Sequence, residues 1–208
     1  MEKRSHCLLA AVSLLLLLSG CSTMNQAECV QADWQIIGQA DASKGEHSAI
    51  LDEYRADCAK FSVVPNREAY FLGYEQGLQQ FCTRASGFYF GKKGGVYSGI
   101  CPKSLEAAFL EGYNPGHELF MIRDELVDLR SSLSSAEGEI RSIERKIKRK
   151  EDQLVSDKST QTERERLLRE IREHHREIFW LRQDARDAQD RILIRQMEYD
   201  RKQQTSPL

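Results

Sequence analysis

Four cysteines are the residues of this sequence best suited to chemistry: Cys29, Cys58, Cys82 and Cys101. Their number is even, and none belongs to the Cys-x-x-Cys or Cys-x-x-His pairs that are typical of zinc sites. In an oxidising compartment, four such thiols form two disulfides, each worth ~2–4 kcal/mol to a small domain. The spacing therefore predicts two disulfide bonds and favours them over a metal site.

The pairing of these cysteines depends on how the helices around them turn. Two helix hairpins, with turns near Gly45 and Pro65, bring Cys29 beside Cys58 and leave Cys82 at the opposite end of the domain. The predicted pairs are Cys29–Cys58 and Cys82–Cys101. The other two connectivities of four cysteines stay open at this point.

No further set of residues in the sequence forms a recognisable catalytic centre. The sequence contains no Gly-x-Ser-x-Gly, no Walker loop and no His-Glu-x-x-His motif. The Gly-Lys-Lys-Gly-Gly run at 91–95 could cradle a phosphate, but it lacks the Lys-Ser/Thr that follows in phosphate-binding loops. We therefore predict that the protein is not an enzyme and has no catalytic residues, no metal and no cofactor.

Residues 1–20 have the layout of an export signal. Two basic residues precede an apolar stretch over 7–18, which is too short to span a bilayer as a stable helix. The sequence Leu-Ser-Gly-Cys at 18–21 resembles the lipobox of bacterial lipoproteins. This resemblance implies cleavage before Cys21, diacylglycerol on its thiol and an N-acyl chain on its new amino group. An ordinary cleaved signal with a coincidental cysteine is the alternative.

The lipobox resemblance also implies a location. Ser22 follows Cys21, where an Asp would mark retention in the inner membrane by enterobacterial sorting rules. The expected location is the outer membrane, with the protein anchored by its lipid and facing the periplasm; the inner membrane is the alternative. The chain of 208 residues has 30 basic and 32 acidic residues. This balance excludes the basic surface that nucleic-acid binding requires.

The sequence after the signal divides into four predicted parts: a polar tether at 21–33, a disulfide-bonded helical domain at 34–117, a coiled coil at 118–200 and a disordered tail at 201–208. In the helical domain, apolar spacing predicts helices from Trp34 to near Gly45, over 48–61 and over 67–82. Residues 84–101 hold five glycines and four aromatics, which predicts a loop or irregular hairpin. Another helix is expected to begin at Pro102.

Small residues recur four apart in this domain. The pairs are Gly38 with Ala42, Gly73 with Gly77 and Gly112 with Gly116. Small residues at this spacing form a flat strip on a helix, which favours close packing of three short helices. The alternative is a binding surface made by the neighbouring tyrosines: Tyr70, Tyr74, Tyr97 and Tyr113.

A longer pattern of residues carries a family resemblance. It reads Cys29…Asp33-Trp34…Ile37-Gly38…Cys58…Pro65…Tyr70-x-x-Gly73-Tyr74-x-x-Gly77-Leu78…Phe81-Cys82…Gly91…Gly94-Gly95-x-Tyr97-x-Gly99-x-Cys101-Pro102. This pattern resembles a family of bacterial lipoproteins catalogued only as a domain of unknown function. The resemblance covers roughly 29–120, with Ala42 as a departure where many relatives have Gly. It implies the compartment but no activity.

The C-terminal part has the spacing of a coiled coil. One apolar series is Leu119, Ile122, Leu126, Leu129, Leu133, Ala136, Ile140, Ile143, Ile147, Lys150 and Leu154. A second series is Leu167, Ile171, His174, Ile178, Leu181, Ala185, Ala188, Ile192, Arg195 and Tyr199. The series are out of phase across the polar stretch 155–163, which favours an antiparallel hairpin over one continuous helix with a stammer.

The register of this hairpin can also be predicted. With a turn centred on Asp157, the residue numbers of partners add up to 314, which pairs Leu129 with Ala185 and Ala136 with Ile178. Each Ala of the seam then faces a large residue. A slide of one heptad would instead set Ala136 against Ala185 and Leu126 against Arg195.

These observations lead to a mainly α-helical architecture, a small disulfide-bonded helical domain followed by a long antiparallel coiled-coil hairpin. The predicted function is that of a membrane-anchored periplasmic lipoprotein with a structural or interaction role. Its coiled coil would present a surface to an envelope protein or cell-wall partner, and self-association is left open. The alternative is a ligand- or glycan-binding module that uses the Tyr/Gly-rich surface of residues 70–101.

Overall fold

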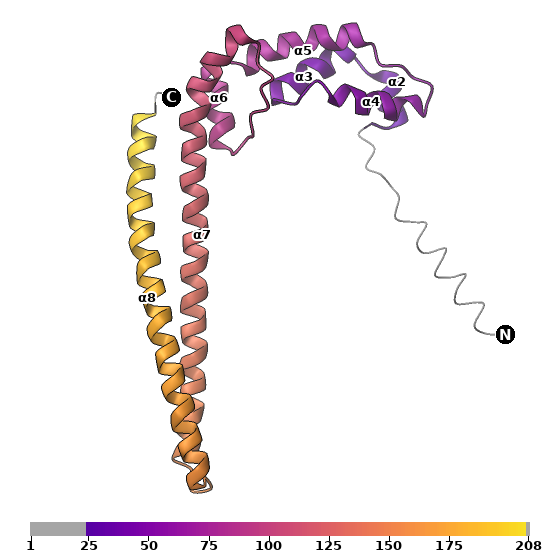
Figure 1. Cartoon of the computed structure of the whole chain (residues 1–208). Helices are drawn as coiled ribbons and strands as arrows, with labels where there is room; N and C mark the ends of the chain where they lie inside the picture. The colour runs from indigo at the N-terminus through magenta and orange to yellow at the C-terminus, as the bar shows by residue number, and fades with distance from the viewer. Residues whose placement is uncertain (1–23, 207–208) are drawn as a thin grey trace, which may run out of the picture. The chain divides into compact units, whose positions relative to one another are not determined.

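The computed structural model describes residues 24–206, so the predicted export signal and Cys21 lie outside the described residues. Every regular element in this range is a helix (Figure 1), which confirms the predicted α-helical architecture. The helices are α2 (Gln26–Gln31), α3 (Trp34–Lys44), α4 (Ile50–Ala59), α5 (Arg67–Phe81), α6 (Arg84–Lys92), α7 (Lys103–Leu154) and α8 (Gln161–Thr205). None of these helices is long and apolar enough to cross a membrane.

The chain forms two compact units. Unit 1 contains the described residues up to Cys82 together with Tyr97–Glu106. Unit 2 contains Thr83–Val96 and the chain from Ala107 onward. Helix α7 therefore begins in unit 1 and continues through the predicted boundary at 117 and 118 without a break. Each unit has its own buried core.

Local signals explain where the helices of unit 1 begin and end. The side chain of Asp33 accepts hydrogen bonds from two backbone N–H groups at the start of α3, and that of Asn66 accepts one from the N–H of Ala69 at the start of α5. Gly45 ends α3 with a φ of 86°, a left-handed conformation that glycine adopts without strain. The predicted helices at 34–45, 48–61 and 67–82 are confirmed, with ends shifted by a residue or two.

The core of unit 1 depends on close contact between α3 and α5. A Cβ atom at Gly73 would lie 1.8 Å from the carbonyl oxygen of Gln35, and one at Gly38 would lie 2.0 Å from that of Tyr70. No side chain fits at either position, so these glycines set the distance between the two helices. The predicted packing role of the small residues is therefore confirmed for this pair.

Residues 84–92 form helix α6, so the predicted loop over 84–101 is wrong for its first half. Thr83 caps the helix by accepting a hydrogen bond from the N–H of Ser86. Gly87, read as a loop residue, lies against the backbone of α7, where a Cβ would be 2.2 Å from the carbonyl oxygen of Phe109. Glycines have low helix propensity, which is why the sequence predicted a loop here. In the structure, their lack of a side chain allows α6 to pack closely on α7.

Both predicted disulfides are present in unit 1. Cys29 is bonded to Cys58, and Cys82 is bonded to Cys101. All four cysteines are buried. Because their sulfurs are bonded to one another, these cysteines are not available as metal ligands.

The tether predicted over 21–33 is wrong for its described part, because it contains helix α2. Asn25 and Glu28 form a reciprocal capping box at the start of this helix. Cys29 of α2 is bonded to Cys58 of α4, and Met24 is 8% exposed. The chain is therefore fixed to unit 1 from Met24 onward.

Helices α7 and α8 run side by side as the predicted antiparallel hairpin (Figure 1). A capping box of Thr160 and Glu163 begins α8 after the turn. The seam includes a cluster of buried isoleucines on both helices: Ile143, Ile147, Ile171 and Ile178. The helix α8 extends to Thr205, so the predicted disordered tail is wrong for 201–205.

The predicted register of the hairpin is wrong. Several ion pairs join the helices, and three of them indicate one register: Lys150–Glu170, Glu125–Arg195 and Glu118–Lys202. The residue numbers of each of these three pairs add up to 320, close to the rejected slide of one heptad. The prediction rested on the apolar seam alone. Its register would place Lys150 level with Arg164, and two like charges side by side repel each other.

Candidate functional site

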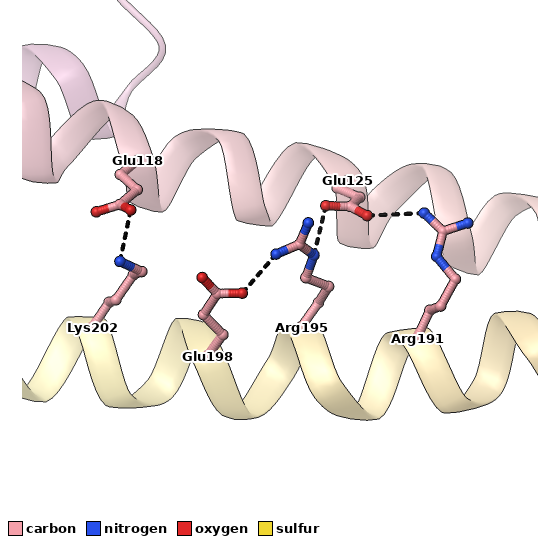
Figure 2. Close-up of polar contacts among 6 residues, drawn as sticks. All are labelled: Glu118, Glu125, Arg191, Arg195, Glu198 and Lys202. Atoms are coloured by element: carbon pink, nitrogen blue, oxygen red, sulfur yellow. Dashed lines mark hydrogen bonds and ion pairs between the residues drawn. The ribbon is translucent and has the colours of Figure 1, made fainter.

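A network of charged residues joins α7 to α8 at the open end of the hairpin in unit 2 (Figure 2). The Lys202 Nζ lies 2.6 Å from the Glu118 Oε1. Glu125 binds two guanidinium groups, that of Arg191 at 3.0 Å and that of Arg195 at 2.8 Å. These contacts span both helices and hold α8 in one rotational setting against α7.

Arg195 is the centre of this network. Its guanidinium donates to Glu125 on α7 and to Glu198 on α8, the latter at 2.6 Å. The hydrogen bond to Glu198 and the charge of Glu125 raise the pKa of Arg195 above its ordinary value, so the group stays charged. From the sequence alone, Arg195 was a poor partner for Leu126 in the slid register of the seam. Its long side chain instead reaches the flank, where both carboxylates are available.

The rotational setting of α8 determines which of its residues face away from α7. Leu193 and Ile194 lie between Arg191 and Arg195 in the sequence, and Met197 follows Arg195; the three side chains are 62%, 63% and 65% exposed. Leu193 and Met197 are four residues apart and therefore share one face of the helix, with Ile194 beside Met197. We call Leu193, Ile194 and Met197 the aliphatic patch of α8.

A second exposed apolar group lies about four turns earlier on α8. Phe179 and Trp180 are 58% and 64% exposed, and their ring centroids are 5.3 Å apart in an edge-to-face arrangement. Large exposed apolar side chains that gather on one element are a feature of interaction surfaces. Both groups fall outside the two apolar series of the coiled coil. This position outside the seam is the feature of the sequence that could have indicated their exposure.

The tyrosines of the alternative binding surface are occupied within the protein. Tyr70 is fully buried, and its hydroxyl donates to the Asp41 carboxylate at 3.0 Å. Tyr54 donates to the other oxygen of Asp41 at 3.3 Å. Tyr74 is 6% exposed and donates to the carbonyl oxygen of Glu46. Tyr70 and Tyr74 thus contribute to the core of unit 1 rather than to its surface.

The two remaining tyrosines are partly buried, and each belongs to a different unit. In unit 1, the Tyr97 hydroxyl donates to Glu106 at 3.1 Å and accepts from the N–H of Cys101, next to the second disulfide. In unit 2, Tyr113 donates to the carbonyl oxygen of Gly95 and stacks between Phe109 and His117. Both side chains secure the segment between α6 and α7.

The electrostatics of unit 1 centre on Asp41. Burial raises the pKa of this carboxyl, and the hydrogen bonds from Tyr70 and Tyr54 oppose that rise. Burial and the charge of Asp41 raise the pKa of Tyr54 to about 12. The hydroxyls therefore remain protonated donors at neutral pH, as a structural network requires.

The comparisons with known proteins match the helical domain. No curated protein and no solved structure is similar enough to the chain to count as a match. Residues 33–118 match a family model described as "Protein of unknown function (DUF2799)". This range covers α3 to α6 and the start of α7, and agrees with the expected likeness over roughly 29–120. The chain thus contains a DUF2799 domain of unknown function, followed by the long hairpin.

Proposed function

We propose that this protein is a lipoprotein anchored by Cys21 to the outer membrane, where its α7–α8 hairpin binds a protein of the cell envelope. The anchoring is supported by the lipobox-like sequence at 18–21 and by the two disulfides, which fit an exported protein. The outer-membrane location is supported by Ser22.

The observation that carries the interaction role is the aliphatic patch of α8. The seam of the hairpin already buries the apolar series that holds the two helices together. Leu193, Ile194 and Met197 are additional to that seam, and the ion pairs of Arg191 and Arg195 fix them on the outward side. Covering a side chain of this size removes it from water and contributes about 1.5–3 kcal/mol.

The aromatic pair extends this proposed surface. Trp is among the residues that contribute most at protein interfaces, and Trp180 is 64% exposed beside Phe179. The aromatic pair and the aliphatic patch are thus two apolar groups on α8 with charged and polar residues between them, an arrangement that suits a helical or extended protein partner. The ligand-binding alternative has less support, because Tyr70 and Tyr74 are buried.

The experiment that tests the interaction is site-specific photo-crosslinking in intact cells. A photoreactive amino acid at Leu193 is expected to give a defined protein adduct. The matched control is Asp184, an exposed residue nine positions earlier and therefore on the opposite face of α8. The adduct at 193 should disappear in Met197→Asp. An equal adduct at 184, or an adduct that survives Met197→Asp, would contradict a specific surface.

The anchoring is tested separately. Mass spectrometry of the N-terminal peptide is expected to show diacylglycerol and an acyl chain on Cys21, and Cys21→Ser should abolish this modification and release the protein from the membrane fraction. Deletion of 121–208 keeps the anchor but removes most of the hairpin. If the truncated protein still captured the same partner, the hairpin would not be the binding element.

A further inference from the structure

The point where the chain leaves unit 1 toward Cys21 is fixed on α4. Met24 is 8% exposed, and its N–H donates to the Asp57 Oδ2 at 3.3 Å. The Met24 Sδ lies 4.0 Å from the sulfur of Cys58, which is bonded to Cys29 of α2. A backbone contact, a side-chain contact and a disulfide therefore hold the start of the described chain against the C-terminal end of α4.

Very little chain separates this point from the lipid-bearing residue. Only Ser22 and Thr23 lie between Cys21 and Met24. Three residue steps span at most ~10 Å, at ~3.3–3.6 Å per residue. A tether of a dozen residues, as the sequence alone indicated, would leave unit 1 free to turn in any direction. A tether of two residues restricts the orientations that unit 1 can take at the membrane.

We propose that the C-terminal end of α4 and the loop at 60–65 form a surface that contacts the lipid bilayer. This inference rests on the proposed lipid attachment at Cys21. If Cys21 carries the lipid, its acyl chains enter the bilayer within ~10 Å of Met24. The parts of unit 1 nearest to Met24 must then lie at the headgroup region.

The residues at this place suit a membrane surface. Lys60 lies beside the exit point, because its Nζ is 2.6 Å from the Asp57 Oδ1 while Met24 binds the other oxygen of the same carboxylate. The side chain of Lys60 is 60% exposed, which leaves its ammonium group within reach of lipid phosphates. A lysine at this position interacts with headgroups while its aliphatic stem covers apolar surface.

The loop after Lys60 supplies the apolar residues of the proposed membrane-contact surface. Val64 is 83% exposed, although aliphatic side chains are usually covered. It borders a groove of about 470 Å³ together with Ala56, Ala59 and Val63. Ser62, with a φ of 59°, turns the chain out of α4 and presents this loop. A cation beside exposed aliphatic side chains is the arrangement found in peripheral membrane-binding segments.

The test uses the lipidated protein in vesicles of phosphatidylethanolamine and phosphatidylglycerol with brominated acyl chains, which quench nearby tryptophan emission. Val64→Trp places a reporter in the proposed surface. Leu72→Trp is the control, an exposed residue on α5, 52% accessible in the same unit. After subtraction of the emission of Trp34 and Trp180, the reporter at 64 is expected to lose much more emission than the reporter at 72.

The outcomes separate this inference from the proposed function. Equal quenching at 64 and 72 in a protein whose Cys21 is shown to be lipidated would overturn the contact surface and leave the anchor intact. Absence of lipid on Cys21 would overturn both. Strong quenching at 64 alone, which Lys60→Glu should weaken, supports the surface.

Discussion

At the scale of single residues, Asp41 organises the core of unit 1. Its carboxylate is buried at 6% exposure and accepts hydrogen bonds from Tyr70 on α5 and Tyr54 on α4, so three helices meet at one group. A buried carboxylate is costly unless it is hydrogen-bonded, and here both oxygens have a donor. The network therefore specifies how α3, α4 and α5 pack.

Removal of one donor from this network has a predictable cost. Tyr70→Phe keeps the ring and leaves one oxygen of Asp41 without its donor at 3.0 Å. We expect the free energy of unfolding of unit 1 to fall by ~1.5–3 kcal/mol, the usual value for a hydrogen bond to a charged group. Urea denaturation at neutral pH measures this loss. Tyr89→Phe, at an exposed position on α6, is the control and should leave the midpoint unchanged.

The same carboxyl makes the stability of unit 1 depend on pH. Burial raises the pKa of Asp41 in the folded protein, so the folded state still holds a proton at pH values where the unfolded state has lost it. Stability from this proton is fully present below the ordinary pKa near ~4 and is lost as pH rises through the folded value. Because the hydrogen bond from Tyr70 lowers the pKa of Asp41, Tyr70→Phe should extend this window upward.

Asp41→Asn is the variant that tests this pH dependence. It removes the titrating group, so the difference in unfolding free energy between the wild type and the variant should decline as pH rises through the window and then stay constant. Denaturant titrations at a series of pH values from ~4 upward measure it. Parallel pH profiles for the two proteins would show that Asp41 does not titrate differently on folding.

At the scale of helices, the protein uses one packing arrangement twice. Gly38 of α3 and Gly87 of α6 are 49 residues apart, and each lies against the backbone of a later helix. Gly45 and Gly94 are also 49 residues apart and both have positive φ, after α3 and α6 respectively. The pair α6 and α7 in unit 2 therefore repeats the arrangement of α3 and α5 in unit 1.

Two glycines of α7 test the packing role within one helix. A Cβ at Gly112 would lie 1.9 Å from the carbonyl oxygen of Arg84, whereas a Cβ at Gly138 would lie 3.8 Å from the flexible side chain of Arg141. Gly112→Ala should destabilise unit 2 by ~1–3 kcal/mol through overpacking. Gly138→Ala should stabilise it by ~0.5–1 kcal/mol, the difference in helix propensity. Thermal unfolding followed by circular dichroism distinguishes a fall from a rise in melting temperature.

The sequence allowed a correct prediction of those features that depend on local signals. The helix predicted over 67–82 is one example, because it begins directly after Asn66, whose side chain accepts a hydrogen bond from the N–H of Ala69. Helix α6 was missed because Gly87 and Gly91 lower helix propensity, and the compensating contact lies in α7, far along the chain. The hairpin register was missed because the prediction rested on the match of sizes in the seam and left out the charged residues on the flanks, which pair across the helices in the actual register.

The candidate surfaces could be predicted only in part for the same reason. The aliphatic patch of α8 was visible as Leu193, Ile194 and Met197 outside the seam series, but its outward direction follows from the ion pairs of the actual register. The proposed membrane-contact surface is inferred from Met24, whose contact with Asp57 joins residues 33 positions apart. Neither the ion pairs between α7 and α8 nor the contact of Met24 with Asp57 is marked by a pattern of neighbouring residues in the sequence.

At the scale of the whole molecule, the two units are stabilised by different means. Unit 1 has roughly 70 described residues, a size at which a hydrophobic core alone gives only marginal stability. Both disulfides lie in this unit, beside the closely packed helices α3 and α5. In the hairpin of unit 2, stability comes from a long apolar seam and from ion pairs between α7 and α8. This division predicts that reduction affects the two units unequally.

Reduction of the disulfides should lower the stability of unit 1 alone. Each bond closes a loop, with sequence separations of 29 and 19, and its loss is expected to cost ~2–4 kcal/mol by restoring freedom to the unfolded chain. Under dithiothreitol, far-ultraviolet circular dichroism should show an early transition for unit 1 and an unchanged later transition for the hairpin. Trp34 in unit 1 and Trp180 in α8 allow separate assignment, through Trp34→Phe and Trp180→Phe variants that each leave one tryptophan to report by fluorescence. A single transition that shifts as a whole on reduction would mean that the two units unfold together, and that the disulfides of unit 1 also determine the stability of the hairpin.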